Sequence, residues 1–145
     1  MKNFQYNDGG RAKAGFKGST GDCVTRSIAI LIQKPYLEVY NDLNKLCKAE
    51  NNIRIKKGKR KCSSRTGIAR KIYEKYLESL GYKWIPTMLV GKGCKVHLCK
   101  EELPSGRIAC RVSKHLTTVI DGVINDTFNP SRDGKCCVYG YYIKK

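Results

Sequence analysis

Three residues of this chain carry side chains that together could cleave an amide bond: Cys23, His115 and Asp126. A thiolate attacks a carbonyl carbon, an imidazole moves the proton, and a carboxylate orients the imidazole and stabilises its cation. Cys23 directly precedes a largely apolar run, 24–31, which predicts that it lies at the start of a helix. A helix N-terminus lowers the pKa of a thiol and offers unpaired N–H groups to an oxyanion. If the three side chains meet, they form the site of a thiol hydrolase.

Two observations bear on Cys23 alone. Asp22 is expected to be the N-cap of this helix, and its carboxylate would repel a thiolate unless it is turned away to cap the helix. The alternative interpretation of Cys23 is a small buried cysteine on an apolar helix.

The turn at 121–122 (Asp-Gly) predicts that His115 and Asp126 come together. Asp-Gly is typical of a two-residue hairpin loop, and with that loop Thr117 pairs with Asp126. Side chains two residues apart share a face of a strand, so His115 becomes a diagonal neighbour of Asp126, at about 7–8 Å between backbones. Asn125 points to the other face, which favours Asp126 as the partner of the histidine.

The second histidine of the chain, His97, is the alternative base, but no carboxylate occupies a comparable cross-strand position. It lies close in sequence to Cys94 and Cys99, and the pair 136–137 could add further cysteine ligands to a zinc ion. The spacing Cys-x2-His-x-Cys is not that of a regular zinc ribbon, and adjacent cysteines chelate one ion poorly. We therefore expect no metal and no cofactor, with structural zinc as the alternative.

The eight cysteines indicate free thiols more than disulfides, because the N-terminus lacks the apolar core of a secretory signal. No stretch approaches the roughly 20 apolar residues of a membrane helix. We expect a cytoplasmic protein without a membrane span, in the host cell if the protein is viral.

The chain is strongly basic, with 29 Lys and Arg against 12 Asp and Glu, a net charge of +17. Such a surface attracts acidic partners and polyanions. Six cations fall within 54–61, which predicts a basic loop at about 50–66. With aromatic side chains to stack bases, this run makes nucleic-acid binding the main alternative function. The aromatic candidates are Tyr73, Tyr76, Trp84, Tyr139, Tyr141 and Tyr142.

Periodicity and turn signals predict helices first and strands afterwards, with an irregular segment at 1–20. Helices are expected over about 22–32, 35–49 and 67–80. Strands are expected over 82–85, 107–112, 116–120, 123–128 and 136–143, with a short extended piece at 94–98. This order indicates one α+β domain over residues 1–145, with N-terminal helices packed on a mostly antiparallel sheet.

A cysteine at the start of an early helix, a histidine on a later strand and an Asp on the next strand resemble the papain-like cysteine peptidase fold. The small size and the Asp-Cys pair at 22–23 are most similar to its small bacterial and viral members. These include bacteriocin-processing peptidases, cell-wall amidopeptidases and transglutaminase-like proteins. The resemblance implies Cys23 as nucleophile, His115 as general base and Asp126 as the residue that orients the base.

The chain departs from this family at two places. Papain-like enzymes usually carry a Gln about six residues before the nucleophile, where this chain has Lys17; Gln5, Asn7 or Lys17 could complete the oxyanion hole instead. The cell-wall members follow Asp-Cys with Ser-Gly, and here 24–25 is Val-Thr. The stretch Asp-Cys-Val-Thr-Arg-Ser and the ending Tyr-Gly-Tyr-Tyr also resemble phage and viral proteins.

The function expected from these residues is a cysteine-dependent peptidase, isopeptidase or amidase that forms an acyl-enzyme and acts on a protein or peptide. A transferase that uses an amine instead of water would need the same residues. The alternatives are a basic nucleic-acid-binding protein and a papain-like binding module without activity. The sequence leaves the oligomeric state open.

Overall fold

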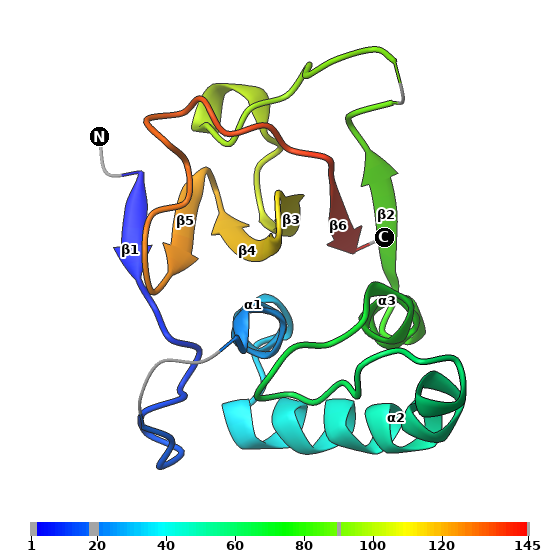
Figure 1. The fold of residues 1–145 in the computed structure, drawn as a ribbon. Helices are drawn as coiled ribbons and strands as arrows, with labels where there is room; N and C mark the ends of the chain where they lie inside the picture. The colour runs from blue at the N-terminus through cyan, green and yellow to red at the C-terminus, as the bar shows by residue number, and fades with distance from the viewer. Residues whose placement is uncertain (1–2, 18–20, 90, 145) are drawn as a thin grey trace.

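The computed structural model describes residues 3–17, 21–89 and 91–144. In this part of the chain three helices lie on one side of a six-stranded sheet (Figure 1). The helices are α1 (Cys23–Ile32), α2 (Tyr36–Lys56) and α3 (Arg70–Ser79), with a short 3-10 helix η1 (Lys100–Glu102). The strands are β1 (Phe4–Tyr6), β2 (Tyr82–Pro86), β3 (Arg107–Val112), β4 (His115–Ile120), β5 (Val123–Asp126) and β6 (Gly140–Lys144). The predicted α+β class is confirmed.

The sheet has the strand order β1-β5-β4-β3-β6-β2, and only β1 and β5 pair in parallel. The β4–β5 hairpin has the predicted register, since Ile120 pairs with Val123 and Thr118 with Asn125. Its loop residues, Asp121 and Gly122, have φ values of 49° and 81°. Two positive φ angles are what the tight hairpin turn predicted from Asp-Gly requires.

The main core fills the space between α1 and the sheet, and α2 covers the far side of α1. Its fully buried members include Ile28, Leu31, Leu43, Leu77, Ala109 and Tyr142. A second core lies on the opposite face of the sheet, where Leu98 and Val138 cover Ile108, Val119 and Ile124. Because α1 is buried on nearly all sides, its apolar sequence reflects its central position.

Helix α2 continues to Lys56, seven residues beyond the predicted end at 49. The Asn51 amide explains part of this extension, because it donates to the Cys62 carbonyl and accepts from the Cys62 N–H. Arg54 Nε also donates to the Arg60 carbonyl at 2.7 Å. The cations of the basic run therefore begin in the last turn of a helix, where the dipole favours positive charge. The loop predicted from residue 50 begins only after Lys56.

Other boundaries differ because pairing between distant segments sets them. Strand β1 lies within the segment expected to be irregular, and it exists by parallel pairing with β5. The last strand begins at Gly140, because Cys137 pairs with His97 in an isolated bridge. Cys94 and Cys137 form a disulfide, which corrects the expectation of free thiols for this pair.

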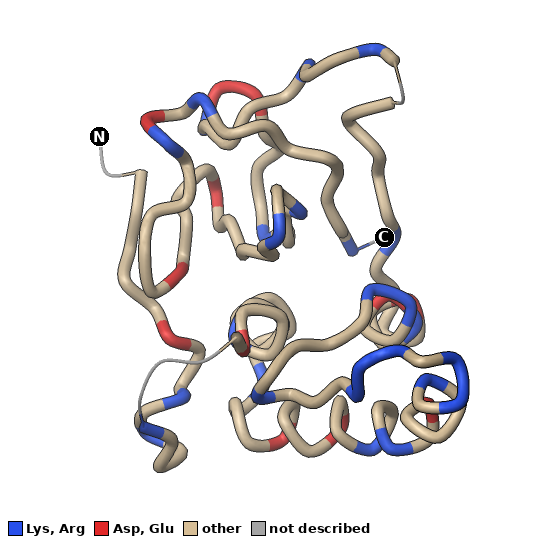
Figure 2. Tube along the Cα trace, in the orientation of Figure 1, with Lys and Arg blue, Asp and Glu red and all other residues tan. Residues whose placement is uncertain are grey.

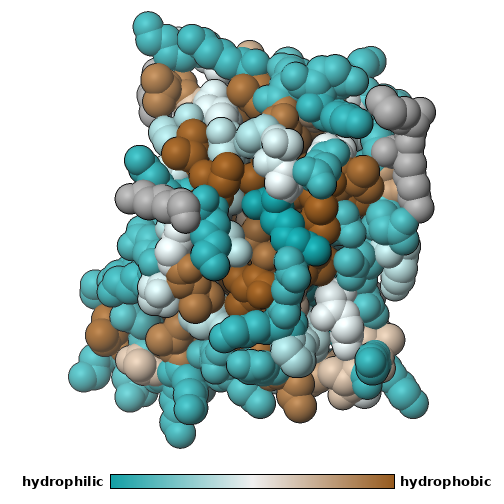
Figure 3. Space-filling model, turned by 180° about the vertical axis from the view of Figure 1, so that it is seen from behind, coloured by the Kyte–Doolittle hydropathy of each residue, from teal (hydrophilic) through white to brown (hydrophobic). Residues whose placement is uncertain are grey.

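None of the helices in the described ranges is long and apolar enough to cross a membrane. Lysine and arginine residues are concentrated at the C-terminal end of α2 and in the loop that follows it (Figure 2). On the face seen from behind, hydrophilic residues predominate and apolar residues show between them (Figure 3). Scattered exposed apolar area of this kind is normal for a folded protein.

Candidate active site

Helix α1 places Cys23, its first residue, beside the start of β4. Ser27 Oγ donates to the Leu116 carbonyl at 2.6 Å, and Thr118 Oγ1 donates back to the Ser27 carbonyl at 2.6 Å. Thr25 Oγ1 donates to the Ser64 carbonyl at 2.8 Å, which ties the same turn to the loop before α3. These three buried hydrogen bonds fix where the N-terminus of α1, and therefore the Cys23 thiol, meets the sheet.

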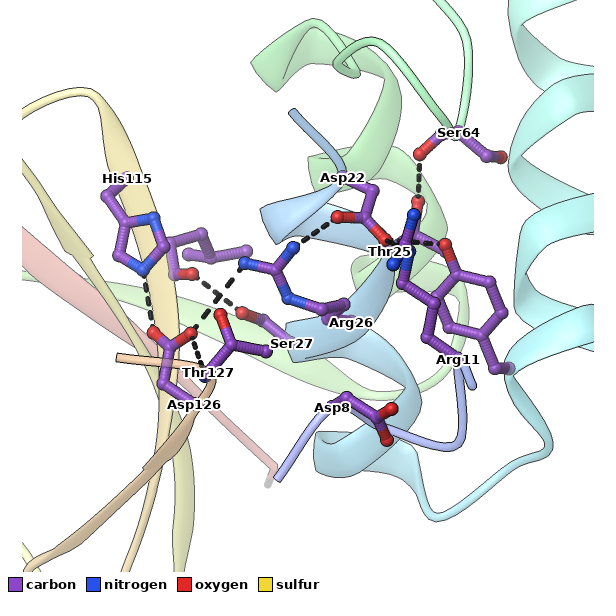
Figure 4. Close-up of polar contacts among 12 residues, drawn as sticks. Asp8, Arg11, Asp22, Thr25, Arg26, Ser27, Ser64, His115, Asp126 and Thr127 are labelled. Atoms are coloured by element: carbon purple, nitrogen blue, oxygen red, sulfur yellow. Dashed lines mark hydrogen bonds and ion pairs between the residues drawn. The ribbon is translucent and has the colours of Figure 1, made fainter. Parts of the chain in front are cut away.

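His115 and Asp126 are in direct contact. His115 Nε2 lies 2.7 Å from Asp126 Oδ2, and Thr117 Oγ1 donates to the same oxygen at 2.7 Å. The Thr127 N–H donates to Asp126 Oδ1 at 2.7 Å, so both carboxylate oxygens are held (Figure 4). Asn125 bonds elsewhere, to the Val123 carbonyl and to Asn7, as expected for the other face. The hairpin register thus brings together the imidazole and carboxylate chosen from the sequence.

The Cys23 thiol and the His115 ring line the same cleft, and each shifts the pKa of the other. Because Asp126 occupies Nε2, the nitrogen left for the thiol is Nδ1. Burial raises the pKa of the Cys23 thiol, but hydrogen bonds from His115 and the Leu116 backbone and the positive charges nearby outweigh burial and lower it. The site therefore favours a thiolate.

The pKa values of His115 and Asp126 shift in the directions that keep both charged. Burial lowers the pKa of His115, but the hydrogen bonds and charges of Asp126 and Cys23 outweigh it and raise the pKa to about 9. Burial raises the pKa of Asp126, but the hydrogen bonds from His115, Thr117 and Thr127 hold it below its usual value. These shifts favour an imidazolium and a carboxylate beside a thiol whose lowered pKa favours its thiolate.

The Asp22 carboxylate is turned away from the thiol and is buried, with 1% of the residue exposed. It pairs with Arg26 and with Arg11 Nε at 3.0 Å, and it accepts a hydrogen bond from the Tyr36 hydroxyl at 2.6 Å. Asp22 is the N-cap residue of α1 as predicted, and its carbonyl accepts from the Arg26 N–H at 3.0 Å, but its side chain makes no capping hydrogen bond. Asp22 instead serves a buried ionic network, and the repulsion of the thiolate is offset by two guanidinium groups.

Arg26 is the residue of this site that the sequence argument missed. Its guanidinium lies between the two carboxylates, with Nη1 on Asp22 and Nη2 3.7 Å from Asp126 Oδ1 (Figure 4). The sequence contains a signal for this ion pair, because Asp22 and Arg26 are oppositely charged and four residues apart at the start of one helix. Arg26 connects the N-terminus of α1 to the carboxylate of the His115 pair.

The cleft in front of Cys23 and His115 has a volume of ≈ 370 Å³ and is cationic. Arg70, Arg111 and Lys114 line it, and no carboxylate is among its lining residues. Arg70 also pairs with Glu74 and lies over the Trp84 ring, so its position is fixed. Such a cleft attracts anionic groups to the neighbourhood of the thiol.

The residues considered for the oxyanion hole have described contacts elsewhere, and for Lys17 the described contact involves only its backbone carbonyl. The Asn7 amide bonds Asn125 and the Gly9 N–H. Gln5 lies on β1 and donates to the Tyr6 carbonyl. The Lys17 carbonyl accepts from Arg11. The best remaining donor is the N–H of Cys23, because an amide of the first helical turn has no partner within the helix.

His97 does not line the cleft and belongs to a different cluster. Its Nδ1 lies 3.2 Å from Glu102 Oε1, and its Nε2 lies 3.6 Å from Cys94 Sγ. Glu102 also accepts from Cys99 Sγ at 2.9 Å. The alternative base is thus separated from Cys23 and has a carboxylate partner that the strand argument overlooked.

The aromatic residues considered for base stacking are partly used in the core. Tyr142 is 0% exposed and packs against Tyr73 and Trp84, with ring centroids 6.0 and 4.9 Å away. The Tyr76 hydroxyl donates to Asp42 at 2.9 Å. Tyr73 and Tyr142 are therefore core residues, whereas Trp84, Tyr139 and Tyr141 are half-buried.

No family model, curated protein or solved structure matches this chain. The resemblance to papain-like peptidases therefore remains an expectation from sequence. The case for a function depends on the geometry and charges of the site itself.

Proposed function

We propose that this chain is a cysteine-dependent hydrolase of amide bonds, with Cys23 as nucleophile, His115 as general acid and base and Asp126 as the orienting carboxylate. The observation that carries the proposal is that Cys23 shares a cleft with His115, whose ring lies 2.7 Å from the buried carboxylate of Asp126. The papain-like resemblance supports it, since that family uses the same three groups in the same order along the chain.

The cycle follows from these positions. The Cys23 thiolate attacks the carbonyl carbon, a C–S bond forms, and the oxyanion is held by the Cys23 N–H at the start of α1. The imidazolium of His115 gives its Nδ1 proton to the leaving nitrogen as the C–N bond breaks. Nδ1 then takes a proton from water, hydroxide attacks the acyl-enzyme, and the acid leaves as the C–S bond breaks. Asp126 stays ionised throughout.

The test is selective alkylation of Cys23. We expect iodoacetamide near neutral pH to modify Cys23 at least tenfold faster than the other free thiols, because a thiolate is the reacting form. Site-resolved mass spectrometry over a time course measures each rate. The burial-raised pKa of Cys110 makes that thiol the slow internal reference. Equal rates at Cys23 and at Cys99, which is half-buried like Cys23, would end the proposal.

A parallel assay separates an enzyme from an inactive binding module with the same fold. A fluorogenic peptide library is incubated with the wild-type protein and with Cys23→Ala, and cleavage is followed by fluorescence. Cleavage that disappears in Cys23→Ala supports the hydrolase. A reactive Cys23 without cleavage of peptide, isopeptide or side-chain amide substrates would support the binding module.

The charge of the cleft favours substrates with an acidic group beside the scissile bond. Lys114 is exposed at its rim and lines the cleft with His115. We expect Lys114→Glu to lower kcat/KM by about tenfold, or roughly 1.4 kcal/mol, for a peptide with Glu beside the cleaved amide. The matched peptide with Gln at that position should change little.

Lys135→Glu is the control, because it makes the same change of charge at an exposed residue outside the cleft. Paired measurements of kcat/KM on the two peptides give the comparison. An equal loss in both lysine variants would show that net charge, and not the cleft, selects the substrate.

A further inference from the structure

A second cluster of reactive side chains lies away from the Cys23 cleft, on the sheet face opposite the helices. Cys94 Sγ, His97 Nε2 and Cys137 Sγ lie within 4.8 Å of one another, and all three residues are half-buried. They come from two segments far apart in sequence, the stretch after β2 and the stretch before β6 (Figure 1). In sequence Cys94 and His97 lie beside Cys99, with 136–137 as possible further ligands, and the structure brings Cys137 rather than Cys99 to the group.

The backbone fixes these three side chains toward one another. His97 and Cys137 form an antiparallel bridge. The Leu98 N–H donates to the Cys136 carbonyl at 2.8 Å, and the Val138 N–H donates to the Val96 carbonyl at 2.8 Å. The two segments therefore meet as a short ladder, and the side chains at 97 and 137 are held at matched positions.

The histidine is oriented as a metal ligand would be. Glu102 Oε1 lies 3.2 Å from His97 Nδ1, and this contact directs Nε2 toward the sulfurs. A carboxylate on the second nitrogen is the usual outer partner of a zinc-binding histidine. Cys94 Sγ and His97 Nε2 are 3.6 Å apart. A tetrahedral ion with bonds of about 2.3 Å to sulfur and 2.0–2.1 Å to nitrogen separates its ligands by roughly that distance.

We propose that Cys94, His97 and Cys137 bind a zinc ion when the cysteine pair is reduced. In the structure the two sulfurs are joined as a disulfide, so the metal-binding form is the dithiol. Binding replaces two S–H bonds by two Zn–S bonds and releases two protons, and the imidazole binds as the neutral base. Two sulfurs and one imidazole favour zinc over magnesium or calcium. No other His, Cys, Asp or Glu ligand atom of the described residues joins the group, so the fourth position belongs to water.

The place of the cluster suggests a structural role. It joins the segment that carries Leu98 to the segment that carries Val138, and both residues are buried in the second core. A zinc ion there would hold that cover on the sheet, while its three protein ligands and one water leave an open position that the four-ligand structural zinc sites lack. The site and the Cys23 cleft are separate, so a failure of either proposal leaves the other standing.

The experiment measures zinc in the full chain, purified with a phosphine reductant and without chelator. Alkylation mass spectrometry first verifies that Cys94 and Cys137 are reduced. We expect about one zinc per chain by elemental mass spectrometry for the wild type. The zinc content per chain of His97→Gln and of Cys94→Ser should be at least tenfold lower than that of the wild type. Cys99→Ser is the matched control and should keep it, because the Cys99 thiol contacts Glu102 and is not one of the three ligands.

Two further measurements distinguish the loss of a metal ligand from the unfolding of a variant. His97→Gln retains both cysteines and can still form the disulfide, so circular dichroism of its oxidised form checks that it folds. Cobalt added to the reduced wild type should give a thiolate charge-transfer band that His97→Gln and Cys94→Ser lack. Verified reduction without zinc or cobalt binding would overturn the proposal and leave the pair as a disulfide. Zinc that persists in Cys94→Ser would overturn it equally, by placing the metal elsewhere.

Discussion

Asp126→Asn is expected to lower the turnover of the best amide substrate by roughly 10²–10⁴-fold, the range that positioned acid–base catalysis contributes. The carboxylate holds His115 Nε2 at 2.7 Å and supports the imidazolium. An amide in its place loses the charge and can present its NH2 group to Nε2, which would favour the wrong tautomer. The measurement is kcat with a fluorogenic substrate.

The pH profile distinguishes this role from a loss of folding. The hydrogen bond and charge of Asp126 help to raise the pKa of His115 to about 9, and the imidazolium helps to lower the pKa of Cys23. Without the carboxylate the pKa of His115 falls and the pKa of Cys23 rises. The pH range in which thiolate and imidazolium coexist should therefore narrow from both sides. The rate of Cys23 alkylation, measured as a function of pH, reports the lower and the upper end of this range.

Two variants serve as comparisons for Asp126→Asn. His115→Gln removes the base without touching the contact between Arg26 and Asp126, and it should lose activity to a similar extent. Asn125→Ala changes the neighbouring residue, which bonds Asn7 and the Val123 carbonyl, and it should keep kcat near the wild-type value. A wild-type profile in Asp126→Asn, or a large loss of kcat in folded Asn125→Ala, would contradict the assignment.

The hairpin register could be predicted because it is set locally. A two-residue turn fixes which residues face each other, and the alternation of a strand then fixes which side chains share a face. The sequence alone is therefore enough to favour Asp126 over Asn125 as the partner of the histidine. The position of Cys23 at a helix start was equally local, since an apolar run and its boundary define it.

The parts that could not be predicted depend on contacts between distant segments. The Phe4–Tyr6 strand has too few residues to show an alternating hydrophobic pattern. It forms because it pairs in parallel with β5. The disulfide partner of Cys94 lies 43 residues away, and no spacing rule identifies it. The burial of Arg26 was hidden for a different reason, because a charged residue on a helix is normally expected at the surface.

Arg26→Gln is expected to lower the free energy of unfolding by about 3–5 kcal/mol, as removal of one partner of a buried ion pair does. The Arg26 side chain is 10% exposed, and its guanidinium lies between the buried carboxylates of Asp22 and Asp126. Without it, Asp22 keeps only Arg11 and the Tyr36 hydroxyl. Chemical denaturation followed by circular dichroism measures the loss.

Arg60→Gln changes an exposed cation beyond α2 and is the control. Its free energy of unfolding should stay within about 0.5 kcal/mol of the wild-type value.

A double-mutant cycle attributes the effect to the Asp22–Arg26 pair. Asp22→Asn removes the carboxylate that Arg26 contacts most closely, so the two changes together should cost less than the sum of their separate effects. The expected coupling is about 1–3 kcal/mol in the free energy of unfolding. Additive losses would mean that Arg26 stabilises the fold through its packing alone. Because the same guanidinium also reaches Asp126, the cycle further tests whether one ionic network supports both the start of α1 and the carboxylate behind His115.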